Sequence, residues 1–192
     1  MEVHVRSERL SQVNTIPPKR ECLHLLCSAD MPRHIQEHSQ MVCQVALVIA
    51  DGLIAAGVKI DRPLVSASAL LHDITKLSSF KTGENHAQTG CDFLAARGFV
   101  AVGEIVRQHV MLDDYFAAAV PSEVEVVNYA DKRVLHDRVV QLDDRMAYIL
   151  KRYATTRERR KVLAQLWQRT RQLEDRLFSY LNFRPDEMAK QL

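Results

Sequence analysis

Apolar residues recur every three to four positions along most of this chain, a spacing that places them on one face of a helix. The alternation typical of strands is absent apart from the first few residues. Hydrophobic residues make up 47% of the 192 positions and aromatic residues only 6%, a balance that favours packed helices over a sheet. The sequence therefore predicts an all-α fold, and a chain of this length can bury a sizeable core.

Proline, glycine and aspartate mark where several of these helices begin and end. Pro32 lies where a helix start tolerates proline, and Gly57 lies where the same helix would end. Asp61 is a plausible N-cap for the next helix, with Pro63 in its first turn, and Gly98 separates two shorter helices. The sequence predicts helices over about residues 19–29, 32–56, 61–73, 84–97, 99–110, 143–153 and 157–182, with a loop rich in Ser, Thr and Gly over residues 78–83. A further helix opens at Pro121–Ser122 and contains Asp131.

The helical pattern divides the chain into three segments. Residues 1–18 are polar and end in two prolines, so we expect a loose or strand-like N-terminal arm. Residues 19–153 form the helical domain, and residues 154–192 form a C-terminal helical extension. The extension would pack on the domain or on a partner subunit, which leaves a homodimer open. Its apolar stripe consists of Val162, Leu166, Leu173, Leu177 and Leu181.

Net charge, hydropathy and cysteine content indicate which partners and which cellular compartment to expect. The formal net charge of +2 indicates neither a nucleic-acid binder nor a membrane-surface protein. Residues 151–176 are rich in Lys and Arg, but such a run on an amphipathic helix is usually a solvated face, so a nucleic-acid partner is not expected. We find no apolar run of the roughly 18 residues that a membrane span needs, and no signal-peptide core. The four cysteines contain no CxxC pair, which is consistent with reduced thiols and a cytoplasmic protein.

The most informative polar feature is His72–Asp73, at the end of the apolar segment ALLHDITK. A buried carboxylate needs a cation or strong hydrogen-bond donors, because burial alone would drive it neutral. Adjacent side chains on a regular helix diverge by about 100°, so one ion can bind both only from between them or if the helix distorts. A second His-Asp pair, His136–Asp137, lies among charged residues and is predicted to be a solvated face, so it serves as an internal control.

Four further residues are candidate partners of this pair. His38 precedes apolar residues at helical spacing that point it inward, although His34 lies one turn earlier and could compete. Asp131 follows Val and Ala residues on its helix and should face the core with them. His86 begins one helix and His109 ends another. Each of these residues alone could be structural, and only the joint pattern indicates a metal centre.

At these residues the chain resembles the HD-domain metal-dependent phosphohydrolase superfamily. Its members carry a distant His, the His-Asp doublet and a distant Asp on a helical bundle, and the binuclear subgroup adds two histidines in between. The segments HDITK and HAQTG look like the corresponding parts of HD-GYP phosphodiesterases and of small bacterial dinucleoside-tetraphosphate hydrolases. The segment VMLDDYF lacks the second His and the GYP tripeptide, which argues against cyclic dinucleotides as substrates. The resemblance covers about residues 20–150.

The resemblance implies an HD-domain-like bundle with a divalent transition metal, one or two ions per chain. Fe or Mn is favoured, while imidazole and carboxylate donors also suit Co, Ni or Zn. A metal-activated hydroxide would cleave a phosphate ester or anhydride of a small phosphorylated molecule, a dinucleoside polyphosphate being the first guess. The implied metal ligands are His38, His72, Asp73, His86, His109 and Asp131, with Asp73 bridging two ions. Asp73 and Lys76 are the implied catalytic residues, and Lys76, Arg33, Lys81 and Lys132 are candidate phosphate contacts.

Two other functions stay open from the sequence. One is a mononuclear phosphatase of nucleoside monophosphates, in which His86 and His109 contact substrate, and the number of metal ions per chain would separate it from the binuclear enzyme. The other is a non-catalytic HD signalling or scaffold domain, although the chain retains both the doublet and the last Asp. Cys22, His24 and Cys27 lie close in sequence but are predicted to be ordinary packing residues.

Overall fold

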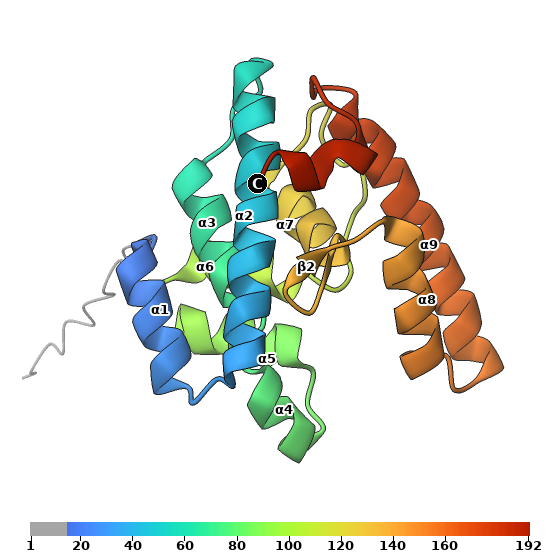
Figure 1. Cartoon of the computed structure of the whole chain (residues 1–192). Helices are drawn as coiled ribbons and strands as arrows, with labels where there is room; N and C mark the ends of the chain where they lie inside the picture. Colours follow the sequence, from blue (N-terminus) through green and yellow to red (C-terminus); the bar gives the residue numbers. More distant parts are fainter. Residues whose placement is uncertain (1–14) are drawn as a thin grey trace, which may run out of the picture.

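The computed structural model describes residues 15–192, and its regular structure is almost entirely helical, as predicted (Figure 1). Residues 1–14, which include the predicted strand-like lead-in, lie outside the described part. One antiparallel hairpin joins β1 (Val134–Leu135) to β2 (Arg138–Val139), and a short 3₁₀ helix, η1 (Pro185–Lys190), lies near the C-terminus. The helices are α1 (Lys19–Ser28), α2 (Arg33–Ala55), α3 (Arg62–Leu71), α4 (Lys76–Thr82), α5 (His86–Ala95), α6 (Val100–Arg107), α7 (Glu123–Lys132), α8 (Leu142–Tyr153) and α9 (Arg157–Phe178).

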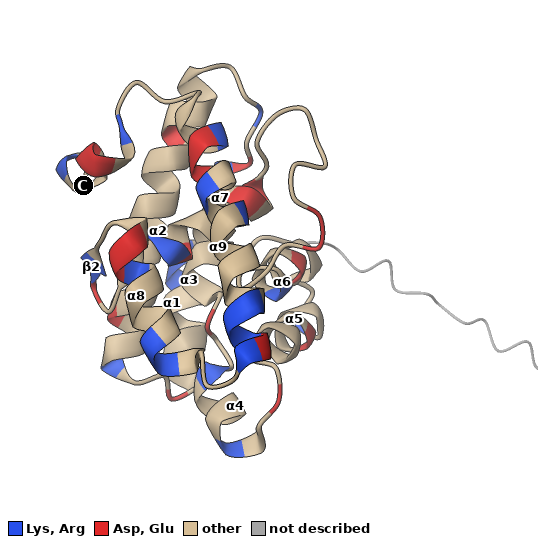
Figure 2. Cartoon of the chain, turned by 90° about the vertical axis from the view of Figure 1, so that its right-hand side faces the viewer, with Lys and Arg blue, Asp and Glu red and all other residues tan. Residues whose placement is uncertain are grey.

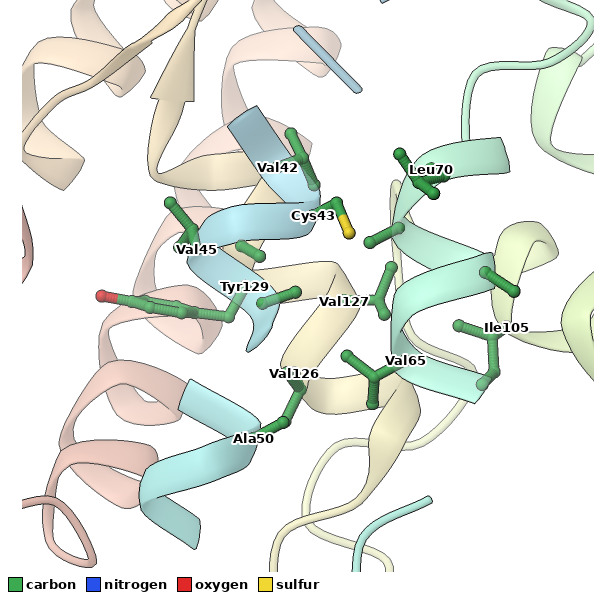
Figure 3. Packing of buried hydrophobic residues seen from close by; sticks show 14 of the residues in the cluster. Val42, Cys43, Val45, Ala50, Val65, Leu70, Ile105, Val126, Val127 and Tyr129 are labelled. Carbon is green, nitrogen blue, oxygen red and sulfur yellow. The ribbon is translucent and has the colours of Figure 1, made fainter. Parts of the chain in front are cut away.

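Helix α2 lies at the centre of the bundle, with α3 and α7 packed against it (Figure 1). Its inner face is apolar because small and branched residues recur at helical spacing. Figure 3 shows Val42 and Val45 of α2 in one cluster with Val65 of α3 and Val126 and Val127 of α7. These side chains are fully buried, so the helices that position His38, the doublet and Asp131 share one rigid core.

By length and apolar composition alone, α2 could cross a membrane, contrary to the expectation that no segment reaches this length. Half of its most apolar window is buried inside the protein, however. A helix surrounded by α3, α7 and the β hairpin needs apolar residues on most of its faces. The length and hydropathy of α2 therefore follow from its central position in the bundle.

The predicted helix boundaries agree closely with the structure. The Asp61 side chain accepts a hydrogen bond of 3.0 Å from the backbone N–H of Leu64, as an N-cap does. Ser122 and Glu125 form a capping box at the start of α7. Gly98, between α5 and α6, has a φ of +83°, a conformation that glycine adopts without strain.

Two local predictions were wrong. Of the predicted loop 78–83, residues 78–82 form most of α4, because the hydroxyls of Ser78 and Ser79 donate to backbone carbonyls one turn earlier and remain compatible with a helix. Gly83 then ends α4 with a φ of +76°. The β1–β2 hairpin was missed because strands of two residues carry no readable alternation.

The C-terminal segment packs partly on the domain and partly projects from it. Leu173 and Leu177 of α9 and Met188 of η1 are fully buried and belong to the main core. Val162, on the first half of α9, is 53% exposed, so the predicted apolar stripe is buried only in its second half. There α8 and α9 pair with each other as a projecting hairpin (Figure 1). The division at residue 154 and a contact with a partner subunit stay predictions.

Candidate metal centre

The helix that carries the His-Asp doublet ends at the doublet itself. Helix α3 stops at Leu71, and the following backbone makes tight bonds from Ile74 N–H to the Leu71 carbonyl, 3.0 Å, and from Lys76 N–H to the Asp73 carbonyl, 2.9 Å. The distortion that the sequence required is therefore present. Both side chains are buried, with His72 Nε2 lying 3.4 Å from Asp73 Oδ2.

A first group of donor atoms lies where α2, α7 and the doublet meet. One donor atom from each of His38, His72 and Asp73 lies within 4.8 Å of the others. Asp131, from α7, joins this group because its Oδ1 is 3.3 Å from His38 Nε2 and 3.8 Å from His72 Nε2. Residues separated by 93 positions thus converge on one point.

A second group shares Asp73 with the first. Asp73 Oδ1 lies 3.4 Å from His86 Nε2 and 3.6 Å from His109 Nε2, and the two Nε2 atoms are 3.1 Å apart. His86 stands at the start of α5 and His109 follows the end of α6, so these helices bring them to the doublet. The two oxygens of Asp73 therefore face different groups, with Oδ2 toward His72 and Oδ1 toward the other two histidines.

Backbone carbonyls orient three of the four histidines. In each case Nδ1 donates to a carbonyl, which leaves Nε2 unprotonated in the neutral ring and directed into the cluster. Such outer contacts are typical of histidines that bind metals. The bonds run from His38 to His136 O at 2.8 Å, from His72 to Ala69 O at 2.8 Å and from His109 to Val106 O at 2.7 Å.

Two buried atoms of the cluster lack hydrogen-bond partners in the described part of the chain, and a cation could bind both. Within residues 15–192, His72 Nε2 and Asp73 Oδ1 are buried without a hydrogen-bond partner. Buried polar atoms are rarely left so, because each carries a desolvation cost of about 1–3 kcal/mol. A divalent ion would serve both atoms. The mixture of imidazole and carboxylate suits first-row transition metals better than Ca²⁺.

The ionisation states also suit metal binding. Burial favours the neutral form of Asp73, but the imidazoles around it, His72 foremost, outweigh burial and hold the pKa of Asp73 well below its usual range. For Asp131, the charge of Lys132 and the neighbouring imidazole of His38 likewise outweigh burial and lower the pKa. Burial lowers the pKa of His109 to about 4. Its ring is therefore neutral at pH 7, with a free lone pair on Nε2.

Lys76 and Lys132, two of the predicted phosphate contacts, lie at the cluster. Lys76 Nζ lies 2.6 Å from Asp73 Oδ2, and this contact raises the pKa of Lys76 against the effect of burial. Lys132 is buried, donates to the His109 carbonyl and lies 3.3 Å from Asp131 Oδ2. These contacts indicate that Lys132 holds the Asp131 carboxylate in position and balances its charge.

The other two predicted phosphate contacts lie on the surface. The Arg33 side chain is 91% exposed and pairs with Glu37 at 2.7 Å. Lys81 is exposed near the end of α4. No contact joins either of them to the metal-ligand cluster in the described structure, and their roles in substrate binding stay predictions.

The second doublet, His136–Asp137, was predicted to be solvated, and its side chains are exposed. His136 and Asp137 are exposed in the β1–β2 turn, so it is the apolar setting that distinguishes the first doublet. The flanking Lys132 and Arg133 are buried, however, and the prediction of a solvated face was wrong for them because each makes several hydrogen bonds inside the protein.

Sequence reasoning missed one charged residue of the site. Arg145 of α8 is 13% exposed, and its Nη2 lies 3.6 Å from Asp131 Oδ1. The available signal was its position three residues after Leu142 and next to Met146, on a face that both residues bury. Cys22, His24 and Cys27 form no cluster of potential ligands in the described residues, which agrees with ordinary packing.

Comparison with curated proteins finds two relatives, each described as a tRNA (cytidine(56)-2'-O)-methyltransferase. The protein from Picrophilus torridus is 29% identical over 149 residues, which cover 70% of this chain and 41% of the relative. The protein from Thermoplasma volcanium is 31% identical over 142 residues, which cover 73% of this chain and 40% of the relative. This chain therefore spans about two fifths of the length of the curated relatives it matches.

Two further comparisons concern the helical domain. A crystal structure described as a predicted HD superfamily hydrolase, from an uncultured Thermotogales bacterium, aligns with a TM-score of 0.47 and 20% identity over 84% of this chain and 92% of its own. The family model of the HD domain matches residues 35–137, which is more than half of the chain and includes all six predicted ligands. This chain therefore belongs to the HD domain family.

Proposed function

We propose that this protein is a metal-dependent phosphohydrolase with two metal ions. One observation carries the proposal: the Asp73 carboxylate lies between two groups of imidazole Nε2 atoms, one on each side. A carboxylate shared in this way is suited to bridging two cations. Membership of the HD domain family supports hydrolytic chemistry.

In this proposal each of the two groups of residues provides the ligands of one metal ion. His38, His72 and Asp131 would hold one ion, His86 and His109 would hold the other, and Asp73 would bind both. Bound ions of this kind lower the pKa of water and neutralise charge on a phosphoryl group. The backbone bonds to Nδ1 fix the ring orientations in advance, so little reorganisation is needed when metal binds. Fe or Mn remains our first proposal for the metal.

Lys76 is proposed to serve both Asp73 and the substrate. Its ammonium holds Asp73 Oδ2 at 2.6 Å, while its side chain remains 29% exposed. A partly exposed ammonium beside the ligand cluster can also donate to a phosphate oxygen as a point charge. It thus fixes the bridging carboxylate and supplies positive charge where phosphate would enter.

The proposed substrate is a small phosphorylated molecule, with dinucleoside polyphosphates first and nucleoside monophosphates second. We also propose a cytoplasmic location, because all four cysteines are free thiols. A homodimer through the projecting half of α9 is proposed on the basis of its exposed Val162.

A phosphate group on RNA is a second candidate substrate. The relatives described as tRNA methyltransferases align with this chain over about two fifths of their length, so methyl transfer is not assigned to it. The first turns of α9 are basic and exposed, and Figure 2 shows Lys and Arg on that ribbon. Binding of a tRNA transcript that weakens steeply from 50 to 200 mM salt would support this substrate, since each phosphate contact releases counterions. The exposed residues are Arg157, Arg159, Arg160 and Lys161.

Metal analysis combined with a substrate screen tests the main proposal. The wild-type protein should hold two ions per chain and hydrolyse at least one member of a panel of phosphorylated metabolites with Mn, Fe or Co. His86→Ala and His109→Ala should each lower the metal content toward one ion. His34→Ala is the matched control, because this histidine is exposed on the first turn of α2. One ion in every variant would favour the mononuclear phosphatase, and no hydrolysis by the loaded protein would favour a scaffold.

A further inference from the structure

We propose that Arg145 binds a phosphate group of the substrate at the metal centre. This inference rests on the proposed function and deepens it, because it identifies a binding residue that the family resemblance did not supply. The model of the HD domain matches residues 35–137, so Arg145 comes from a helix beyond the matched segment.

The start of α8 places Arg145 at the ligand cluster. Leu142 and Met146 are buried one turn apart, which fixes the inner face of α8 against the domain. Arg145 lies on this face, and its Nη2 is 3.6 Å from Asp131 Oδ1. Tyr148, the next residue along that face, packs edge-on against His136, with ring centroids 5.8 Å apart.

The position of His136 ties α8 to the first group of ligands. The His136 carbonyl accepts the hydrogen bond from His38 Nδ1. The same α8 face therefore contacts the ligand cluster through the guanidinium of Arg145, and through the ring of Tyr148 it contacts His136, whose carbonyl orients His38. These contacts hold Arg145 at the centre although α8 and the first half of α9 otherwise project from the domain.

The guanidinium of Arg145 is largely buried but poorly partnered, with the side chain 13% exposed. Its Nε is buried without a hydrogen-bond partner in the described part of the chain. The contact with Asp131 at 3.6 Å is longer than a hydrogen bond. A guanidinium N–H is costly to bury without an acceptor, and the planar fork of donors matches the oxygens of a phosphate.

The local charge balance leaves room for an anion. Lys76 already pairs with Asp73 at 2.6 Å, and Lys132 lies 3.3 Å from Asp131. Arg145 also faces Asp131, so three cationic side chains share two carboxylates and one positive charge is in surplus. Divalent ions in the two ligand groups would increase this surplus. A multiply charged phosphate beside the metal ions would supply both the missing charge and the missing acceptors.

Phosphate binding and hydrolysis by the Mn-loaded protein test this proposal. Arg145→Ala should weaken the binding of inorganic phosphate, measured by calorimetry, by about tenfold or more, and should raise KM by a similar factor. Metal content should stay at the wild-type value. Arg145→Lys should recover only part of the affinity, because a point charge replaces the planar fork. Arg152→Ala, on an exposed position of the same helix, should bind phosphate as the wild type does.

Two results would overturn the assignment. Unchanged phosphate affinity in Arg145→Ala at full metal content would remove Arg145 from the substrate site. A loss of metal in both Arg145 variants, with normal phosphate affinity at metal saturation, would make it a positioning residue for Asp131. Because calorimetry with inorganic phosphate needs no turnover, a failure of the hydrolase proposal in the substrate screen would remain distinguishable from a failure of this one.

Discussion

Two groups of charged side chains are buried in this protein, and they differ in how completely they are bonded. Around Arg133, every guanidinium nitrogen has a partner: Nε donates to the Val140 carbonyl at 2.8 Å, Nη2 to the Pro185 carbonyl at 2.9 Å, and Nη1 to Tyr129 and Glu174. Around Asp73, a carboxylate oxygen and the Nε2 of His72 have no hydrogen-bond partner, and two imidazole nitrogens lie 3.1 Å apart.

The comparison distinguishes a structural network, whose polar atoms all have hydrogen-bond partners, from a binding site, where some polar atoms have none within the described residues. Burying charge costs free energy in both groups, and the Arg133 network offsets that cost within the chain by joining the end of α7 to α9 and to the first residue of η1. The ligand cluster cannot do so with protein atoms alone. Burial and charge are similar in the two places, so the completeness of hydrogen bonding is the informative difference.

The largest effect is expected from Asp73→Ala. Losing the shared carboxylate should remove bound metal and lower the rate of hydrolysis by about 10³-fold or more, since metal ions contribute several kcal/mol to stabilising such transition states. Helical content, measured by circular dichroism, should be unchanged, because α3 ends before this residue. Steady-state rates and metal content measure the effect.

The second His-Asp pair supplies the control for that variant. Asp137→Ala changes the same residue type in the same dipeptide, but on the exposed hairpin turn, and should leave rate and metal content unchanged. Full activity in Asp73→Ala would remove the basis of the proposed chemistry. Equal losses in both variants would show that the setting of the doublet does not matter.

The opposite result is expected for Arg133→Met, which should reduce stability and spare metal binding. Removing the guanidinium leaves the Glu174 carboxylate without its buried cation and the Val140 and Pro185 carbonyls without a donor. The free energy of unfolding should fall by about 3–5 kcal/mol in a denaturant titration. Arg138→Met, exposed on β2, should change it by less than about 0.5 kcal/mol. A stable Arg133→Met protein that had lost its metal would reverse the assigned roles of the two groups.

Much of the fold and the ligand set follows from local sequence signals. Caps such as Asp61 and Ser122 and the apolar spacing along α2 are short-range features, and the helices they predict are present. The joint pattern of six His and Asp residues predicted a group that the structure brings together. Their roles as ligands remain the proposal to be tested.

The remaining features depend on contacts between residues far apart in sequence. The buried network of Arg133 needs Glu174, 41 positions away, so sequence alone placed Arg133 on a solvated face. Arg145 reaches Asp131 only because the β hairpin turns the chain back after α7. Helix α4 was missed because serine hydroxyls signal a loop as readily as they bond within a helix.

Adding metal should stabilise the ligand cluster more than any other part of the molecule. Binding to the folded state alone contributes about 2.7 kcal/mol per site at a free metal concentration of 100 times Kd. For a chain of this size, that corresponds to a rise in Tm of about 5 to 10 °C in differential scanning fluorimetry with Mn. Chelator should reverse the shift, and Asp73→Ala should show none. An equal shift in that variant would place the stabilising metal elsewhere.

The smallest predicted effect concerns Tyr129, at the centre of the Arg133 network. Burial raises the pKa of this phenol well above its usual value near 10, against the opposing charge of Arg133. The unfolded chain therefore releases this proton at a lower pH than the folded chain does. The stability that depends on the neutral phenol is fully present below pH 10 and declines as pH rises further, by up to about 1.4 kcal/mol for each unit.

Tyr129→Phe isolates this contribution. The variant should be less stable than the wild type at pH 8 by about 1–2 kcal/mol, because Arg133 and Glu174 lose a shared partner. Between pH 9 and pH 11 the difference should shrink, since only the wild type loses the stability linked to this phenol. Denaturant titrations at each pH measure it, and the other tyrosines contribute equally to both proteins. If the unfolding free energies of the two proteins changed with pH in parallel, water would reach the phenol. The Arg133 network would then not be fully bonded within the protein, and the contrast with the ligand cluster would fail.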